Sequence, residues 1–139
     1  MRGFAGDDII LGGDGNDFIR GGAGDDQITG GTGADLLVGK DGADTFIWQA
    51  MDILLGETDR ITDFSVAETD VLSLDGLLAA FNAGSDAISD FVNLSVQSGD
   101  TIVQIDQSGA GNFSVDVVTL SGVTGLDLAT LYANGNLTA

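Results

Sequence analysis

Apolar residues recur at every ninth position through the first third of the chain, separated mostly by glycine and aspartate. These positions hold Ile10, Ile19, Ile28, Leu37 and Phe46. The three residues centred on each of them predict a short strand, because alternate side chains of a strand point to opposite faces. A strict short period indicates a solenoid in which each repeat stacks on its neighbours. The pattern therefore predicts five three-residue strands joined by six-residue loops.

Each copy follows the pattern G-G-x-G-x-D-x-U-x, in which U is a large apolar residue. The copies span residues 3–11, 12–20, 21–29, 30–38 and 39–47, and their sixth positions hold Asp8, Asp17, Asp26, Asp35 and Asp44. Glycine permits close backbone approach and positive φ, so that loop carbonyls can turn toward one point. Two copies make one 18-residue turn of a flattened roll, and loops n and n+2 then stack about 4.8 Å apart.

Aspartates stacked at this spacing repel one another in a partly dry site, and a divalent cation removes the repulsion. Calcium takes six to eight oxygen ligands at roughly 2.3–2.6 Å, which suits two carboxylates and several loop carbonyls. Magnesium and transition metals fit this oxygen set less well. We expect three or more calcium ions, held by Asp8 with Asp26, Asp17 with Asp35, and Asp26 with Asp44. The expected backbone-carbonyl ligands are Gly12, Asp14, Gly21, Ala23, Gly30, Thr32, Gly39 and Asp41.

Two other interpretations of the repeats are weaker. A flexible acidic linker does not place an apolar residue at every ninth position five times. An ice-binding or surface-binding roll needs a regular row of one residue type on an exposed face. The third loop positions are irregular, since they hold Ala5, Asp14, Ala23, Thr32 and Asp41.

Charge and missing residue types narrow the function further. The chain has 22 acidic and four basic residues, a net charge of −18, and neither cysteine nor histidine. Nucleic acid and anionic lipid are therefore poor partners, because both need a basic surface. Disulfides, zinc sites built from Cys or His, and Ser-His or Cys-His catalysis are excluded. No apolar run approaches the roughly 20 residues of a spanning helix, so we expect no membrane insertion. Because the catalytic pairs named above are excluded, we also expect no enzymatic activity in these residues.

Residues 48–139 lose the period but keep apolar content, which predicts a cap over the open end of the solenoid. Trp48 is expected in the core, and residues 51–55 as a short helix or loop. Strands are predicted over 59–64, 70–74, 92–96, 102–105 and 114–120, the third and fourth forming a hairpin around 98–100. One helix is predicted after a Ser73 cap, through Leu74, Leu77, Leu78 and Phe81. A second is predicted from Leu128 to Ala133, capped by Asp127 and stopped by Asn134-Gly135.

The nonapeptide resembles the calcium-binding repeat of RTX proteins. Residues 59–74 and 118–137 resemble the segments that follow such repeat arrays in type I secretion substrates, especially large adhesins. The resemblance implies a C-terminal signal read by an ABC transporter in a Gram-negative bacterium. The candidate signal residues are Leu126, Leu128, Leu131, Tyr132 and Leu137. A further ion at Asp59, Asp63 and Asp70 is an alternative to ordinary strand-end turns there. The ending Asn136-Leu137-Thr138-Ala139 differs from the Asp-plus-apolar ending of many RTX hydrolases.

These observations predict an all-β chain: a parallel β-roll over residues 1–47, capped by a mostly β region with short helices over 48–139. Copy one lacks its second glycine and follows Met1-Arg2 directly, so we expect the C-terminal piece of a longer protein, secreted or at the cell surface. The expected function is a monomeric secretion and folding module of an exported adhesin, which folds outside the cell when calcium binds. The alternatives are a module of an RTX hydrolase and a calcium-dependent ligand-binding module.

Overall fold

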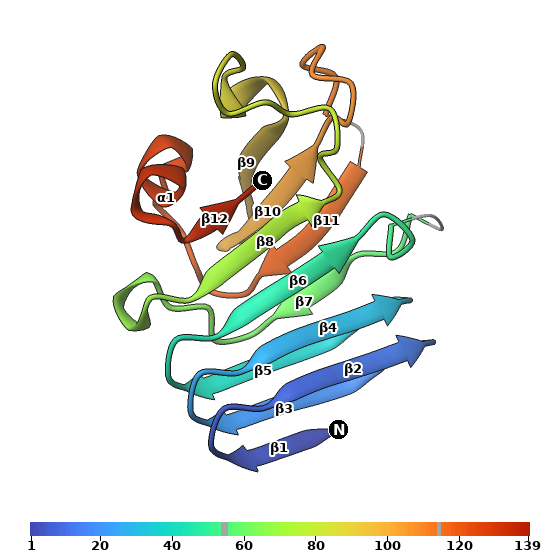
Figure 1. The fold of residues 1–139 in the computed structure, drawn as a ribbon, viewed down its shortest axis with the longest axis vertical. Coiled ribbons are helices and arrows are strands. Elements are labelled where there is room, and N and C mark those ends of the chain that lie inside the picture. Colours follow the sequence, from blue (N-terminus) through green and yellow to red (C-terminus); the bar gives the residue numbers. More distant parts are fainter. Residues whose placement is uncertain (54–55, 114) are drawn as a thin grey trace.

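Two sheets stacked face to face make up most of the molecule, as the computed structural model shows for residues 1–53, 56–113 and 115–139 (Figure 1). One sheet contains, in spatial order, β1 (Arg2–Ala5), β3 (Phe18–Ala23), β5 (Leu36–Asp41), β7 (Asp59–Ile61), β11 (Val115–Leu120), β10 (Asp100–Ile105) and β9 (Val92–Gln97). The other contains β12 (Leu137–Thr138), β8 (Val71–Gly76), β6 (Thr45–Gln49), β4 (Gln27–Thr32) and β2 (Ile9–Asp14). The all-β parallel roll is thereby confirmed.

Successive repeat strands alternate between the two sheets, so each strand pairs in parallel with the strand two copies later. The registers Ile10↔Ile28 and Ile19↔Leu37 confirm the 18-residue turn. The predicted strand length was wrong: β2 to β5 each have six residues. Each continues through the first three loop residues of the next copy, because the glycines there can adopt an extended, closely stacked backbone. Only three residues then remain for the turn.

The second position of each loop has a left-handed backbone in every copy. At Gly31 φ is +104°, and a Cβ there would lie 2.0 Å from the carbonyl oxygen of Gly13 in the strand below. Glycine avoids both the strain and the clash. Phe4 (φ 89°) and Lys40 (φ 88°) occupy this position in copies one and five without that freedom.

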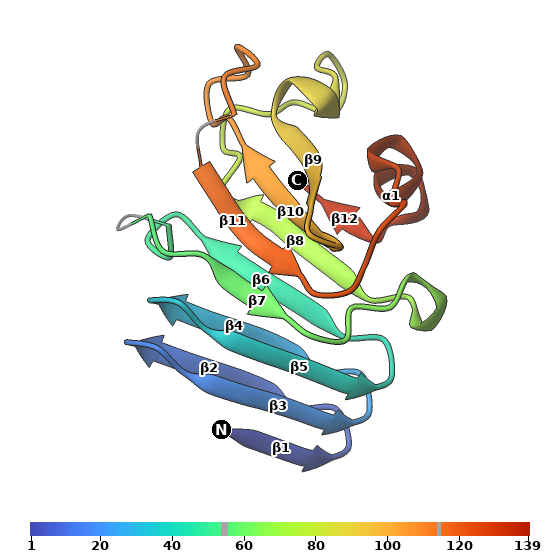
Figure 2. The same ribbon diagram turned by 180° about the vertical axis from the view of Figure 1, so that it is seen from behind.

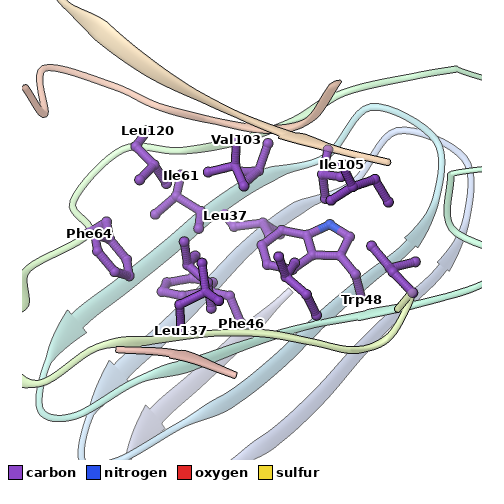
Figure 3. Close-up of a cluster of buried hydrophobic side chains, with 14 of the residues drawn as sticks. Leu37, Phe46, Trp48, Ile61, Phe64, Val103, Ile105, Leu120 and Leu137 are labelled. Atoms are coloured by element: carbon purple, nitrogen blue, oxygen red, sulfur yellow. The ribbon is translucent and has the colours of Figure 1, made fainter. Parts of the chain in front are cut away.

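The eighth-position side chains fill the space between the sheets, and the row continues beyond the last repeat. Ile28, Leu37 and Phe46 are at most 1% exposed. Leu37 is in register with Ile61 of β7, and Phe46 with Leu72 of β8. Residues 59–74 thus add one further turn to the roll, with β7 in one sheet and β8 in the other. Above this turn Val103, Leu120 and Leu137 close the core (Figure 3).

The C-terminal half covers the upper end of the roll, with α1 (Leu128–Asn134) and the β9–β10 hairpin beside it (Figure 2). The hairpin and the helix were both predicted correctly, and the Asp127 side chain accepts a hydrogen bond from the Thr130 amide as the helix cap. Two 3₁₀ turns, η1 (Val66–Glu68) and η2 (Ile88–Asp90), complete the described elements. No helix among the described residues is long and apolar enough to span a bilayer.

The helix predicted after Ser73 was wrong. Ser73 lies within β8, paired with Ile47 of β6 on one side and Thr138 of β12 on the other. Pairing on both edges outweighs the weak helical spacing of the following leucines. Leu77 and Leu78 instead form a turn with buried side chains. Of the segment predicted at 51–55, residues 54 and 55 lie outside the described residues, as does Ser114.

Candidate metal site

The sixth-position aspartates form two hydrogen-bonded ladders, one on each side of the roll. In each rung the backbone amide of one aspartate donates to the Oδ1 atom of the aspartate in the turn above it. The long aspartate ladder joins Asp8 to Asp26, Asp26 to Asp44, and Asp44 to Asp70 at 2.9, 3.0 and 3.0 Å. The short aspartate ladder joins Asp17 to Asp35 and Asp35 to Asp59 at 2.8 and 2.9 Å. The three predicted aspartate pairs are therefore neighbours in space.

Asp59 and Asp70 are the upper rungs of these ladders, a role that the sequence interpretation missed. From the sequence, Asp59 and Asp70 were expected to form a separate ion site with Asp63, or to lie in ordinary strand-end turns. Their spacings to Asp35 and Asp44 are 24 and 26 residues instead of 18. The available signal was the D-x-U pattern itself, which recurs as Asp59-Arg60-Ile61 and Asp70-Val71-Leu72.

The other carboxylate oxygen has no protein partner in most of the repeats. The Oδ2 atoms of Asp8, Asp26, Asp35 and Asp44 are buried and form no hydrogen bond. A buried, unpaired charged oxygen is strongly unfavourable, so such atoms need a cation or a proton. These four oxygens therefore fit a bound cation on each side of the roll.

Two of these oxygens, on Asp8 and Asp26, face a carbonyl from the loop two copies later. A Cβ placed on Gly3 would lie 2.4 Å from Asp8 Oδ2 and 2.8 Å from the Gly21 carbonyl oxygen. On Gly21 the corresponding distances are 2.2 Å to Asp26 Oδ2 and 2.8 Å to the Gly39 oxygen. The first loop position must therefore be glycine to leave the space between carboxylate and carbonyl open.

The side of the roll that carries copies two and four has the same arrangement. A Cβ on Gly12 would lie 3.0 Å from Asp17 Oδ2 and 2.0 Å from the Gly30 oxygen. For Gly30 and Gly39 the three nearest atoms all belong to the aspartate of the same copy, Asp35 or Asp44. Complete cradles of carboxylate and carbonyl thus lie between loops 1 and 3, 2 and 4, and 3 and 5, where ions were predicted.

The predicted carbonyl ligands divide into two groups. The carbonyls of Gly21, Gly30 and Gly39 lie in the cradles, whereas Gly12 lines a cradle through its Cα atom. The carbonyls of Ala23, Thr32 and Asp41 accept hydrogen bonds from the amides of Gly6, Gly15 and Gly24. The Asp14 carboxylate accepts from the Thr32 hydroxyl at 3.0 Å. Metal ligation by any of these residues stays a prediction.

The raised pKa values of the ladder aspartates favour a bound cation. Burial raises the pKa of Asp44 to about 6, and the nearby Asp70, Asp26 and Asp63 carboxylates add to the rise. Burial likewise raises the pKa of Asp35, with Asp17 contributing repulsion. Desolvation and like charges both disfavour a carboxylate without a counter-ion.

The donor set fits calcium. Each complete cradle combines carboxylate and backbone-carbonyl oxygens, which are hard ligands in a tolerant arrangement. Among the described residues no group of three or more His, Cys, Asp or Glu side chains forms a metal-holding cluster. The cradles do not need one, because each combines an aspartate carboxylate with a loop carbonyl. When bound, calcium would neutralise the stacked carboxylates.

Asp59, Asp63 and Asp70 have their carboxylates occupied by protein donors. Asp59 Oδ2 accepts from the Trp48 indole N–H at 2.6 Å, and Asp70 Oδ2 accepts from the Ser65 amide at 2.8 Å. Asp63 accepts from the amides of Gly39 and Lys40, both at 3.1 Å. Trp48 is 2% exposed, so its predicted core position is confirmed.

The candidate signal residues pack onto the folded core. Leu131 and Leu137 are buried, and Leu137 pairs with Leu72 of β8. Leu126, Leu128 and Tyr132 are partly buried against the same cluster.

Asp106, the one acid of its turn, accepts hydrogen bonds from the Ser108, Ala110 and Asn112 amides and the Ser108 hydroxyl.

Comparisons with known proteins agree with the geometry of the repeats. The family profile described as RTX calcium-binding nonapeptide repeat (4 copies) matches residues 2–37 and 29–47. No curated protein matches the chain. The solved AlgE6R3 subunit of the Azotobacter vinelandii mannuronan C5-epimerase is 32% identical, with a TM-score of 0.47, over 86% of this chain and 73% of that chain. The AlgE6R2 subunit of the same enzyme is 23% identical, with a TM-score of 0.36, over 93% and 89%. Residues 2–47 therefore contain RTX nonapeptide repeats, and these repeats bind calcium.

Proposed function

We propose that this chain is a secretion and folding module of an exported protein, in which calcium outside the cell triggers folding of the repeats. The observation that carries the proposal is the set of buried, unpartnered Oδ2 atoms on Asp8, Asp26, Asp35 and Asp44. Without a cation these atoms oppose the rolled state. With a cation they become ligands that hold one turn to the next.

The energies are large enough for a switch. Calcium inside a cell lies far below the dissociation constants of extracellular modules, about 10⁻⁴ to 10⁻³ M. Outside, at calcium about tenfold above the dissociation constant, each site adds about 1.4 kcal/mol, and three sites add about 4 kcal/mol. That sum is near the lower end of the stability of whole domains. The −18 charge favours the open chain until the ions bind.

Export before folding is consistent with the position of the candidate signal. Leu131 and Leu137 are buried in the folded state, so a transporter could read them only on the open chain. We infer a type I secretion signal in residues 126–139, an adhesin as the parent protein, no catalysis within these residues, and a Gram-negative source. A hydrolase parent remains the alternative, and the sequence preceding the repeats would distinguish the two.

Circular dichroism and calorimetry test the calcium switch. In millimolar calcium we expect full β structure and at least three bound ions, and in EDTA a loss of β signal that calcium restores. Identical spectra and melting temperatures in calcium and EDTA would contradict the switch. Fewer than two bound ions would contradict the assignment of the three cradles.

Export assays test the signal. Removing residues 126–139 should abolish secretion by the cognate transporter, whereas Asp17→Ala should leave export intact, because it alters a calcium cradle and not the signal. The truncation also removes α1 and β12, but an unfolded chain remains exportable in this scheme. Normal export of the truncated chain would locate the signal elsewhere.

A second candidate function, calcium-dependent binding of an acidic ligand, is favoured by one groove. Three of the four basic residues, Arg2, Arg20 and Lys40, line a groove of about 360 Å³ beside Phe4. Arg2 and Arg20 are neighbours in the register of β1 and β3, and Phe4 is 75% exposed. Cations beside an exposed aromatic ring suit a carboxylate-bearing oligosaccharide, since guanidinium pairs with carboxylates and the ring can stack on a sugar.

Titration with a galacturonate oligomer at fixed calcium tests this candidate. Arg20→Gln should weaken binding about fivefold, in line with the ~1 kcal/mol of an exposed charge pair. Arg60→Gln is the matched control, because Arg60 lies outside the groove and pairs with Asp100 at 3.2 Å. Equal binding by wild type and the Arg20 variant, or equal binding of a neutral oligosaccharide, would rule the candidate out.

A further inference from the structure

The upper rung of each ladder differs from the repeats below it in the partner of one oxygen atom. In the repeats the Oδ2 atoms of Asp35 and Asp44 are buried without a partner. One turn higher, the Trp48 indole donates to Asp59 Oδ2 at 2.6 Å and the Ser65 amide donates to Asp70 Oδ2 at 2.8 Å. Asp59 and Asp70, at 3% and 2% exposed, are buried like Asp35 and Asp44.

We propose that Trp48 N–H and Ser65 N–H take the place of calcium at the upper ends of the ladders. Asp59 and Asp70 are then not calcium ligands, and the turn that carries them folds without metal. This inference rests on the proposed calcium-triggered folding and deepens it by assigning where metal dependence stops. Hydrogen bonds to an ionised acceptor are roughly twice as strong as neutral ones, so one donor on each Oδ2 can replace an ion that serves many oxygens at once.

The loops at these two rungs are built for the substitution. Asp63 follows β7 at the place where a repeat has its first glycine, and its carboxylate binds the amides of Gly39 and Lys40. The last repeat loop is thereby held by a side chain. On the other side, Trp48 extends from β6 of one sheet and bonds Asp59 at the start of β7 in the other. Figure 3 shows its ring within the core, among Leu37 and Ile105.

The consequence is a direction for folding. Asp35 and Asp44 donate their amides to rungs that are already fixed by Trp48 and Ser65. Each calcium ion bound below can then add a turn to an ordered template. Trp48 is therefore a positioning residue that holds the template rung of the short aspartate ladder, and it is also the only tryptophan in the chain.

Trp48 fluorescence tests the inference on the wild-type chain. In EDTA, β signal should fall while Trp48 keeps a buried emission maximum and the same acrylamide quenching as in calcium, within about twofold. A shift of the emission to that of exposed indole on chelation would overturn the inference, while leaving calcium-triggered folding intact. Conversely, an unchanged β signal in EDTA with Trp48 buried would defeat the proposed function and not the metal-free template.

Trp48→Phe separates the indole N–H from the packing of the ring. Its orphaned Asp59 oxygen should lower the melting temperature in EDTA by about 5–10 °C, and in calcium by less than half as much, because an ion can then supply the missing positive partner. Thr101→Val is the matched control: it removes the buried Thr101–Val123 hydrogen bond, 2.7 Å long and away from the ladders, and should act equally in both conditions. Equal shifts for Trp48→Phe in calcium and EDTA would overturn the role of the N–H.

Discussion

The repeats and the turn above them, formed by β7 and β8, share one backbone plan but differ in how their aspartates are satisfied. Both place an aspartate before a short strand, and both accept an amide on Oδ1. In four of the five repeats Oδ2 is buried without a partner, whereas at Asp59 and Asp70 it accepts a hydrogen bond from the protein. We therefore expect metal dependence in this fold to be set by what the loops donate, and not by the aspartates alone.

Asp106 extends the comparison to a third case. Its carboxylate accepts a hydroxyl and three amides from its own turn, and these hydrogen bonds, led by Ser108, lower its pKa to about 2. Burial without enough donors instead raises the pKa of Asp44 to about 6. In a glycine-rich, six-residue repeat loop the backbone amides donate hydrogen bonds to the neighbouring turns. The loop therefore has no amide left for the carboxylate of its own aspartate.

The largest expected effect of this difference is regional loss of structure on chelation. In EDTA, amide hydrogen exchange in residues 3–47 should approach unfolded rates, because about 4 kcal/mol of calcium stabilisation is removed. Residues 59–74 and 92–139 should keep most of their protection. Mass spectrometry of exchanged peptides measures both regions in one sample. Uniform loss along the whole chain would show that the upper turn also depends on metal.

Blocking a single cradle should give the next largest effect. Gly21→Ala places a Cβ 2.2 Å from Asp26 Oδ2, which closes one cradle and disturbs the carbonyl that serves another. Overpacking and lost sites together should destabilise the calcium form by about 2–4 kcal/mol. Gly84→Ala is the control, since its Cβ would meet only Asn82 Oδ1 at 3.3 Å. Denaturant unfolding in calcium compares the two variants. Equal midpoints would show that the cradle does not contribute to the stability of the calcium form.

The strict period of the repeats made their fold and their aspartate pairs predictable. A nine-residue spacing fixes which side chains share a face, so the register Ile10↔Ile28 followed directly. The extent of β2 did not follow, because a strand that includes two glycines has no propensity signal. Ser73 failed for a related reason: its strand is specified by β6 and β12, both distant in sequence.

The role of the upper rungs was missed because insertions break their period, although the D-x-U pattern itself recurs. Asp59 comes after a loop of irregular length, and nothing local to Trp48 says that its indole will meet that carboxylate 11 residues later. The Ser65 contact with Asp70 depends on the 3₁₀ turn η1, which Ser65 caps by accepting from the Glu68 amide. A strict period predicts that equivalent residues in identical copies have the same role. In a degenerate copy the role of a residue becomes clear only from the tertiary structure.

Acidification should affect the two forms of the roll in opposite directions. Burial raises the folded-state pKa of Asp44 and Asp59 to about 6, from an ordinary value of 3.8. Between these values the folded chain binds more protons than the unfolded chain, so in EDTA stability should rise as pH falls from 7.5 to 5, by about 2 kcal/mol. In calcium, protons compete with the ion and the affinity should fall over the same range. Thermal melts at both pH values decide the first point, and a lower melting temperature at pH 5 in EDTA would contradict it.

The smallest expected effect concerns Lys40, the one departure from glycine at the second loop position within copies two to five. Its φ of 88° is strained for a residue with a Cβ, and its side chain is exposed. Lys40→Gly relieves the strain and keeps the backbone amide that donates to Asp63, so we expect a gain of about 1 kcal/mol in calcium. Lys40→Ala removes the charge but keeps the Cβ, and it should gain little. If the alanine variant is as stable as the glycine variant, the gain comes from charge. If only glycine stabilises, the left-handed backbone at this position, which the repeat pattern reserves for glycine, is what limits copy five.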